Sequence, residues 1–124
     1  MAVLRVEGEE LVLHLRPLEK AEGMHGDIRV PLSSVTAARC VEDPWPELRG
    51  MRAPGTGWPG VIAVGIRRGS FGKDFAAVHG KGPAVVVELD GTDASGGYGR
   101  FVITTDAATA EAAAITAAVA AAQG

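Results

Sequence analysis

Glu-Leu-Val-Leu-His-Leu-Arg, at residues 10–16, is the clearest strand in the chain. Leucine stands at every second position, at Leu11, Leu13 and Leu15, and this two-residue period is typical of a strand with one buried face. Residues 3–7 predict a strand just before it. Gly8-Glu9 between the two is short enough for a hairpin turn, because glycine adopts a positive φ easily. The chain is therefore expected to open with an antiparallel pair.

Further short strands are expected along most of the remaining sequence, interrupted by glycine and proline. Pro31 cannot donate a ladder hydrogen bond, so the strand that contains it lies at an edge or ends there. Residues 17–26 predict a short helical turn or loop, and residues 67–73 a hairpin loop. The strongly apolar run 84–89 is expected at the centre of a sheet. The predicted strands are 27–32, 34–42, 61–66, 74–79, 84–89 and 100–104.

One long helix is expected at residues 106–122, with Thr105 or Asp106 as its N-cap. Ile115 and Val119 lie four residues apart, so they share one face among many alanines. Many short strands followed by one helix predict a mainly β, α+β domain: an antiparallel sheet, sandwich or partly open barrel closed by the helix. The length of 124 residues suits a single domain over 1–124.

The net charge of −3 conceals an uneven distribution along the chain. Residues 49–81 carry six bases and one acid, net +5, and the segments on either side are each net −4. The basic middle indicates either an anion-binding surface or pairing with the acidic flanks after folding. The net negative charge argues against nucleic-acid binding. The sequence shows no signal peptide and no membrane span, which favours a cytoplasmic protein.

Residues 43–60 differ from the rest of the chain. They contain four prolines, four glycines and both tryptophans, Trp45 and Trp58. This composition predicts a long loop without regular structure, and such loops are usually functional or disordered. Two tryptophans argue against disorder. They indicate either a contact surface, where tryptophan and arginine are enriched, or a cover over one sheet face.

A run of short antiparallel strands closed by a single helix resembles the pleckstrin-homology (PH)-like fold, as found in small bacterial PH-like domain proteins of uncharacterised function. Residues 49–60, 72–75 and 85–89 also look like blocks of such proteins. The resemblance implies an antiparallel barrel or sandwich of about seven strands and a non-catalytic module. The first hairpin loop, residues 7–10, is acidic and would repel a phosphorylated head group, so phosphoinositide membrane binding is not expected.

The favoured hypothesis is a non-enzymatic module that contacts a protein partner or itself through residues 43–60, with a homodimer as one form. The alternative is a small-molecule or anion-binding domain, either a binding protein or an enzyme, in which arginines, a lysine and glycine amides at residues 49–60 and 73 hold the ligand. The candidate binding residues are Trp45, Arg49, Arg52, Gly55, Gly57, Trp58 and Lys73.

Catalytic and metal-ligating residues are not expected. His14, His25, His79 and Cys40 show no ligand or nucleophile spacing, and a single cysteine forms no internal disulfide. Asp90 and Asp93 lack the alternation of oxygen ligands that a calcium loop needs. No cofactor is predicted.

Overall fold

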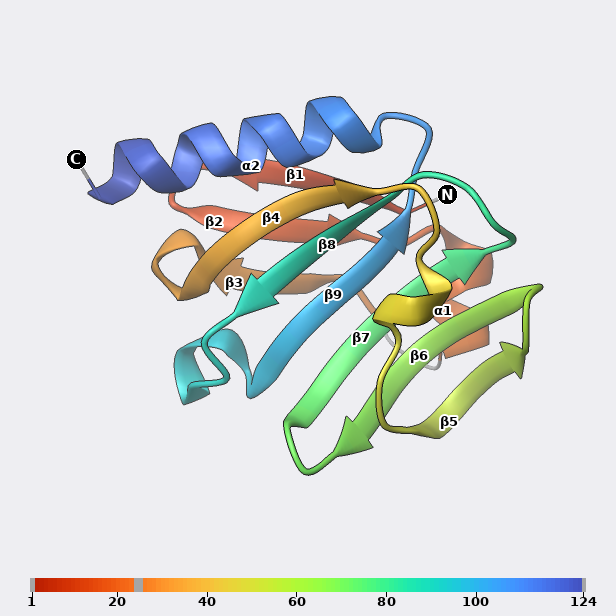
Figure 1. Ribbon diagram of the computed structural model, residues 1–124. Helices are drawn as coiled ribbons and strands as arrows, with labels where there is room; N and C mark the ends of the chain where they lie inside the picture. Colours follow the sequence, from red (N-terminus) through yellow and green to blue (C-terminus); the bar gives the residue numbers. More distant parts are fainter. Residues whose placement is uncertain (1, 24–25, 124) are drawn as a thin grey trace.

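The computed structural model in Figure 1 describes residues 2–23 and 26–123, although the side chains of residues 22–23 and 52–56 lie outside the description. Nine strands are present over these residues: β1 Val3–Glu7, β2 Glu10–His14, β3 Ile28–Pro31, β4 Val35–Val41, β5 Met51–Trp58, β6 Ile62–Gly69, β7 Gly72–His79, β8 Ala84–Leu89 and β9 Tyr98–Thr104. The helices are α1 Pro17–Gly23, α2 Ala108–Gln123 and the 3-10 turns η1 Leu32–Ser34, η2 Trp45–Glu47 and η3 Asp93–Ser95. No helix in the described part is long and apolar enough to cross a membrane.

The strands form two sheets, as Figure 1 shows. The smaller sheet has the order β1-β2-β3 and the larger one β4-β8-β9-β7-β6-β5. The mainly β, α+β class with a C-terminal helix is thus confirmed. The expectation of about seven strands, all antiparallel, is wrong, because the described residues form nine strands and β7 pairs with β9 in parallel. The chain turns back from β8 into β9, which inserts beside β7, so β9 is antiparallel to β8 and parallel to β7. Neither sheet closes into a barrel over the described residues.

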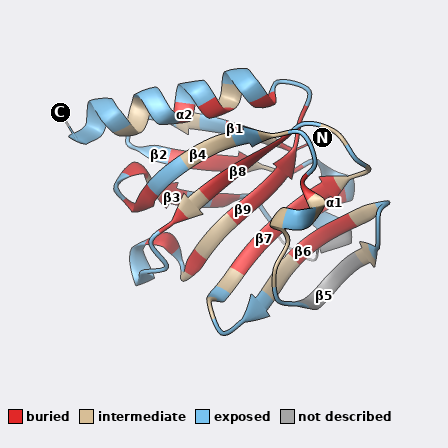
Figure 2. Cartoon of the chain, viewed as in Figure 1, coloured by how far each residue is buried: buried red, intermediate tan, exposed pale blue. Residues whose placement is uncertain are grey.

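The main core lies between the two sheets and α2 closes its open side, as Figures 1 and 2 show. Leu11 and Leu13 of β2 face Phe75, Phe101 and Ile103 of the larger sheet, all fully buried. Burying such apolar side chains stabilises the fold by about 1.5–3 kcal/mol each. The predicted hairpin 3–14 and the central position of β8 are confirmed.

Helix α2 also covers one edge strand of each sheet. The Glu111 carboxylate accepts a hydrogen bond from the Leu4 amide of β1 at 2.9 Å. Thr116 donates from Oγ1 to the Ala38 carbonyl of β4 at 3.3 Å. These contacts protect backbone groups that an edge strand would otherwise present to other chains. The predicted apolar face of this helix is confirmed, because Ile115 is buried in the core and Val119 packs against it.

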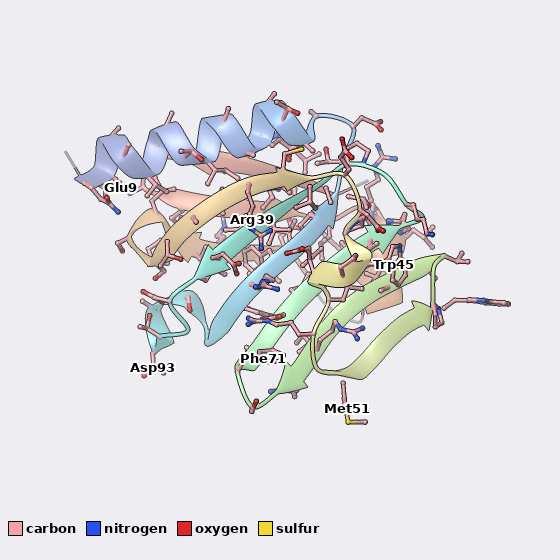
Figure 3. All side chains as sticks on the ribbon, in the orientation of Figure 1. Glu9, Arg39, Trp45, Met51, Phe71 and Asp93 are labelled. Carbon is pink, nitrogen blue, oxygen red and sulfur yellow. The ribbon has the colours of Figure 1, made fainter. Side chains whose placement is uncertain are left out.

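A second, smaller apolar cluster lies on the outer face of the larger sheet. Residues 43–50 run across this face, and Trp45 and Leu48 pack on the cluster from above. Figure 3 shows Trp45 lying over the sheet. The buried members of the cluster are Ala63, Ala76, Val78, Val86 and Val102. The sequence-based alternative of a tryptophan that covers a sheet face is therefore confirmed for Trp45.

Residues 43–60 are not one irregular loop, and that prediction is wrong. Their second half is the eight-residue strand β5, which ends the larger sheet and pairs with β6. An edge strand tolerates Pro54 because only one side of the strand has to supply ladder hydrogen bonds. The register shifts between Arg52 and Gly55, and this irregularity accommodates Ala53 and Pro54.

Candidate functional site

The segment 43–50 is fixed to the sheet by a bidentate ion pair between Arg49 and Asp74. Arg49 donates from Nε to Oδ2 at 2.7 Å and from Nη2 to Oδ1 at 2.9 Å. Asp74 is only 2% exposed, while its partner is about one-third exposed. The guanidinium carbon also lies 4.2 Å from the centre of the Phe71 ring, so a cation–π contact adds to the pair. The hydrogen bonds to Asp74 raise the pKa of Arg49, against the opposing effect of burial.

A second ionic network holds the same segment through Glu88 of β8. Arg100 donates to both Glu88 oxygens at 2.8 and 3.0 Å and to the Glu47 carbonyl at 2.9 Å. Arg39 joins the carboxylates of Glu47 and Glu88 at 2.7 and 3.1 Å. Burial raises the pKa of Glu88, but the hydrogen bonds and charges of the two arginines outweigh it, so the net shift is downward. Glu88 is therefore ionised at neutral pH, where it holds both arginines.

Two more contacts complete the attachment. Trp45 donates its indole N–H to the Gly80 carbonyl at 2.9 Å. Arg67 of β6 donates to the carbonyls of Arg49 and Gly50 at 3.0 and 3.2 Å. Gly50 has φ +76°, and a Cβ there would lie 2.4 Å from the Arg68 carbonyl oxygen, so only glycine fits. The segment is consequently built as part of the sheet surface.

A shallow groove of about 320 Å³ lies between this segment and the end of the β5–β6 hairpin. Gly57 and Ala63 are cross-strand partners, and their small size leaves space between the larger residues around them. The groove is mostly apolar and has one cationic side chain, Arg67. Its lining residues are Trp45, Leu48, Gly57, Trp58, Pro59, Ile62, Ala63 and Arg67.

Large apolar side chains on β5 and in the turn after it are exposed to solvent. Trp58 is 69% exposed, Val61 56% and Met51, at the other end of β5, 81%. Figure 3 shows Met51 pointing away from the sheet. Single exposed apolar residues are common, but tryptophan on an edge strand and beside a groove is typical of a contact surface. The two tryptophans thus have different roles, since Trp45 packs on the sheet and Trp58 is presented to solvent.

The structure brings together only part of the predicted binding set. Trp45, Gly57 and Trp58 line the groove. Arg49 lies on the same outer face but is engaged by Asp74, and Lys73 shares the opposite face with Phe75. Lys73 places its ammonium 4.4 Å from the centre of the Tyr98 ring.

The remaining two predicted residues belong to β5. The backbone of Gly55 pairs with Gly65. Arg52 pairs with Arg67 through the backbone, and its side chain lies outside the described residues. Arg49 does not pair the basic segment 49–81 with the acidic segments on either side of it, because its partner Asp74 belongs to the same segment.

Sequence reasoning missed Leu48, Pro59, Ile62, Ala63 and Arg67 as lining residues. For Ala63 and Arg67 a signal existed, because a two-residue period through residues 61–67 places both on one face. It remained ambiguous, since nothing in the sequence shows which face of that strand the segment 43–50 crosses.

The residues considered for chemistry are dispersed. Thr109 of α2 contacts the Cys40 sulfur at 3.7 Å. The imidazole of His14 bonds Glu7, and His79 lies 3.6 Å from the buried carboxylate of Glu19. His25 lies outside the described residues. Within the part of the chain that is described, no three acidic, histidine or cysteine side chains gather in a way that could hold a metal ion.

Comparisons with protein-family models, with curated proteins and with solved structures found no match to this chain.

Proposed function

We propose that this chain is a non-enzymatic PH-like interaction module, and that it contacts a protein through Trp58, the groove and strand β5. The observation that carries the proposal is the exposure of Trp58 on an edge strand, beside a groove whose other wall is fixed by ion pairs. Two sheets closed by one C-terminal helix support the PH-like assignment. The parallel β7–β9 pair departs from the antiparallel pattern of that resemblance.

The other edges of the two sheets support this location. Helix α2 bonds the backbone of β1 and of β4, and β3 is a short strand that ends in Pro31. Strand β5 is twice as long as β3 and ends the larger sheet. Long edge strands are sites where other chains add to a sheet. Helix α1 lies against β5 and β6, so the proposed contact uses the part of this edge that α1 leaves open.

The alternative of an anion-binding domain has less support. Arg49 is neutralised by Asp74, and Lys73 lies on the opposite face of the sheet. The volume of the groove is at the lower end of the range for small-molecule sites, about 300–1,000 Å³. A protein contact uses the edge strand as well as the groove and therefore explains more of this surface.

Site-specific photocrosslinking tests the proposal. A benzophenone amino acid replaces Trp58 in one variant and Ala121 of α2 in the other, in cells that make the protein. Ala121 is the control because it is exposed and belongs to α2, which packs on β1 and β4. Irradiation is expected to give a discrete protein adduct from position 58 and none from position 121. The mass of the adduct then distinguishes a second copy from a different protein.

Two results would contradict the proposal. One is the absence of a discrete adduct from position 58 in cells that hold the folded variant. The other is an adduct pattern that is the same from both positions, since this would indicate nonspecific contact of exposed apolar residues.

A further inference from the structure

We infer that β5 and the groove accept an extended, acidic segment of another protein, which joins the larger sheet as an additional strand. This inference rests on the proposed function and names the kind of partner. It follows from three features of the surface: the geometry of the edge, the volume of the groove and the sign of the surrounding charge.

The edge provides the mode of binding. Half of the backbone N–H and C=O groups of an edge strand point away from its neighbour, so an extended segment satisfies them by forming a new ladder. Side chains of an added strand alternate between the two faces of the sheet. One set would thus lie on the outer face, where the groove is. The other set would lie on the face that carries Ile66 and Arg68, beside helix α1, which contacts β5 and β6.

The groove provides the apolar contact. Its volume of about 320 Å³ has room for one large apolar side chain against Trp45 and Leu48. Trp58 lines the groove and is itself largely exposed, so its ring is accessible to an added side chain. Aromatic anchors of this kind contribute most of the affinity in many interfaces.

The charge around the edge selects the partner. Arg68 is the cross-strand partner of Met51 of β5, so its charge lies beside one end of the edge strand. Arg68 and Lys73 are cross-strand partners, and neither has a carboxylate within 4.0 Å among the described residues. An acidic segment is attracted to this region, whereas the β5 edge of a second copy would bring the same positive charge against it. A different, acidic chain is therefore the occupant that the charges favour.

Selection from a random peptide library tests the inference without a known partner. Phage that display random linear decapeptides are selected in parallel on the purified wild-type protein and on Trp58→Ala. The wild-type protein is expected to enrich peptides with an excess of Asp and Glu around one large apolar residue. The Trp58→Ala variant is expected to recover at most about one-tenth as many phage with such peptides, because the anchor is lost.

Affinity measurements on the most enriched peptide, made as a synthetic fluorescent probe, test the role of charge. The double variant Arg68→Gln/Lys73→Gln is expected to weaken binding by about five-fold, and added salt should weaken the wild-type complex similarly. Arg5→Gln/Arg29→Gln is the matched control, because it removes two charges from exposed residues of the smaller sheet. It should change the affinity by less than about two-fold. Thermal unfolding confirms that each variant is folded.

Enrichment that is equal on both proteins, or enriched peptides without an acidic excess, would overturn the inference. An adduct from position 58 with the mass of two copies of this chain would also overturn it. The proposed function would survive both results if position 58 still gives a specific adduct. It fails when that adduct is missing or when the control position gives the same adduct pattern, so the two failures are distinguishable.

Discussion

Arg49→Met is expected to destabilise the domain by about 3 kcal/mol, because it leaves the buried Asp74 carboxylate without its bidentate partner. This value is at the lower end of the range for broken buried pairs, since the Arg49 side chain is one-third exposed and water can partly replace it. The cation–π contact with Phe71 is lost as well. Urea unfolding monitored by circular dichroism measures the change in free energy of unfolding.

Arg68→Met is the matched control for this substitution. Arg68 of β6 is also an arginine close to segment 43–50, because its carbonyl oxygen lies beside Gly50. It has no carboxylate partner among the described residues, so a change in the free energy of unfolding below about 0.5 kcal/mol is expected. Adding Asp74→Asn to Arg49→Met should recover part of the loss, because the buried charge is removed. Equal losses for Arg49→Met and Arg68→Met would show that the ion pair does not anchor segment 43–50.

Trp45→Ala is expected to destabilise the domain by about 2–3 kcal/mol, between the values for surface and for fully buried positions. Trp45 covers the outer apolar cluster and donates a hydrogen bond to Gly80, and alanine does neither. Trp45→Phe keeps most of the packing and loses the hydrogen bond, so a loss of about 1 kcal/mol is expected. Thermal and urea unfolding of the variants measure both effects.

The comparison with Trp58→Ala separates the two tryptophans. Because Trp58 is 69% exposed, its replacement should change the free energy of unfolding by less than about 0.5 kcal/mol. A large loss of stability for Trp58→Ala, together with a small one for Trp45→Ala, would reverse the roles assigned to them. Trp58 would then be a structural residue and could not serve as the anchor of a contact surface.

Local patterns in the sequence predict the regular part of this fold. The alternation of Leu11, Leu13 and Leu15 identifies β2, and the apolar run 84–89 identifies a central strand. Strand β5 could not be predicted, because its proline and glycines have an unfavourable intrinsic propensity for strands. Its formation depends on β6 as a neighbour and on its own place at an edge, and both are properties of the whole sheet.

The sequence allowed the tryptophans of the candidate site to be predicted, but it did not show which charged residues pair or which face of the sheet they occupy. Arg49 and Asp74 are 25 residues apart, and only the folded sheet shows that they neutralise each other. Lys73, the neighbour of Asp74, points to the opposite face, because successive side chains of a strand alternate. A basic segment in the sequence therefore divides between two faces, and a list of its cations does not describe one site.

An NMR titration of the nitrogen-15-labelled domain with the most enriched acidic peptide tests β5 as the contact surface most directly. Strand addition predicts that the largest shift changes fall on the amides of Met51–Trp58 and on the Trp58 indole. The exchange of β5 amides with solvent should slow, and the amides of β1 should not shift. A second groove lies between β1 and α2, lined by Leu4, Ala114 and Ile115 among others. Shift changes concentrated there, with β5 unaffected, would contradict the assignment of the contact surface to Trp58 and β5.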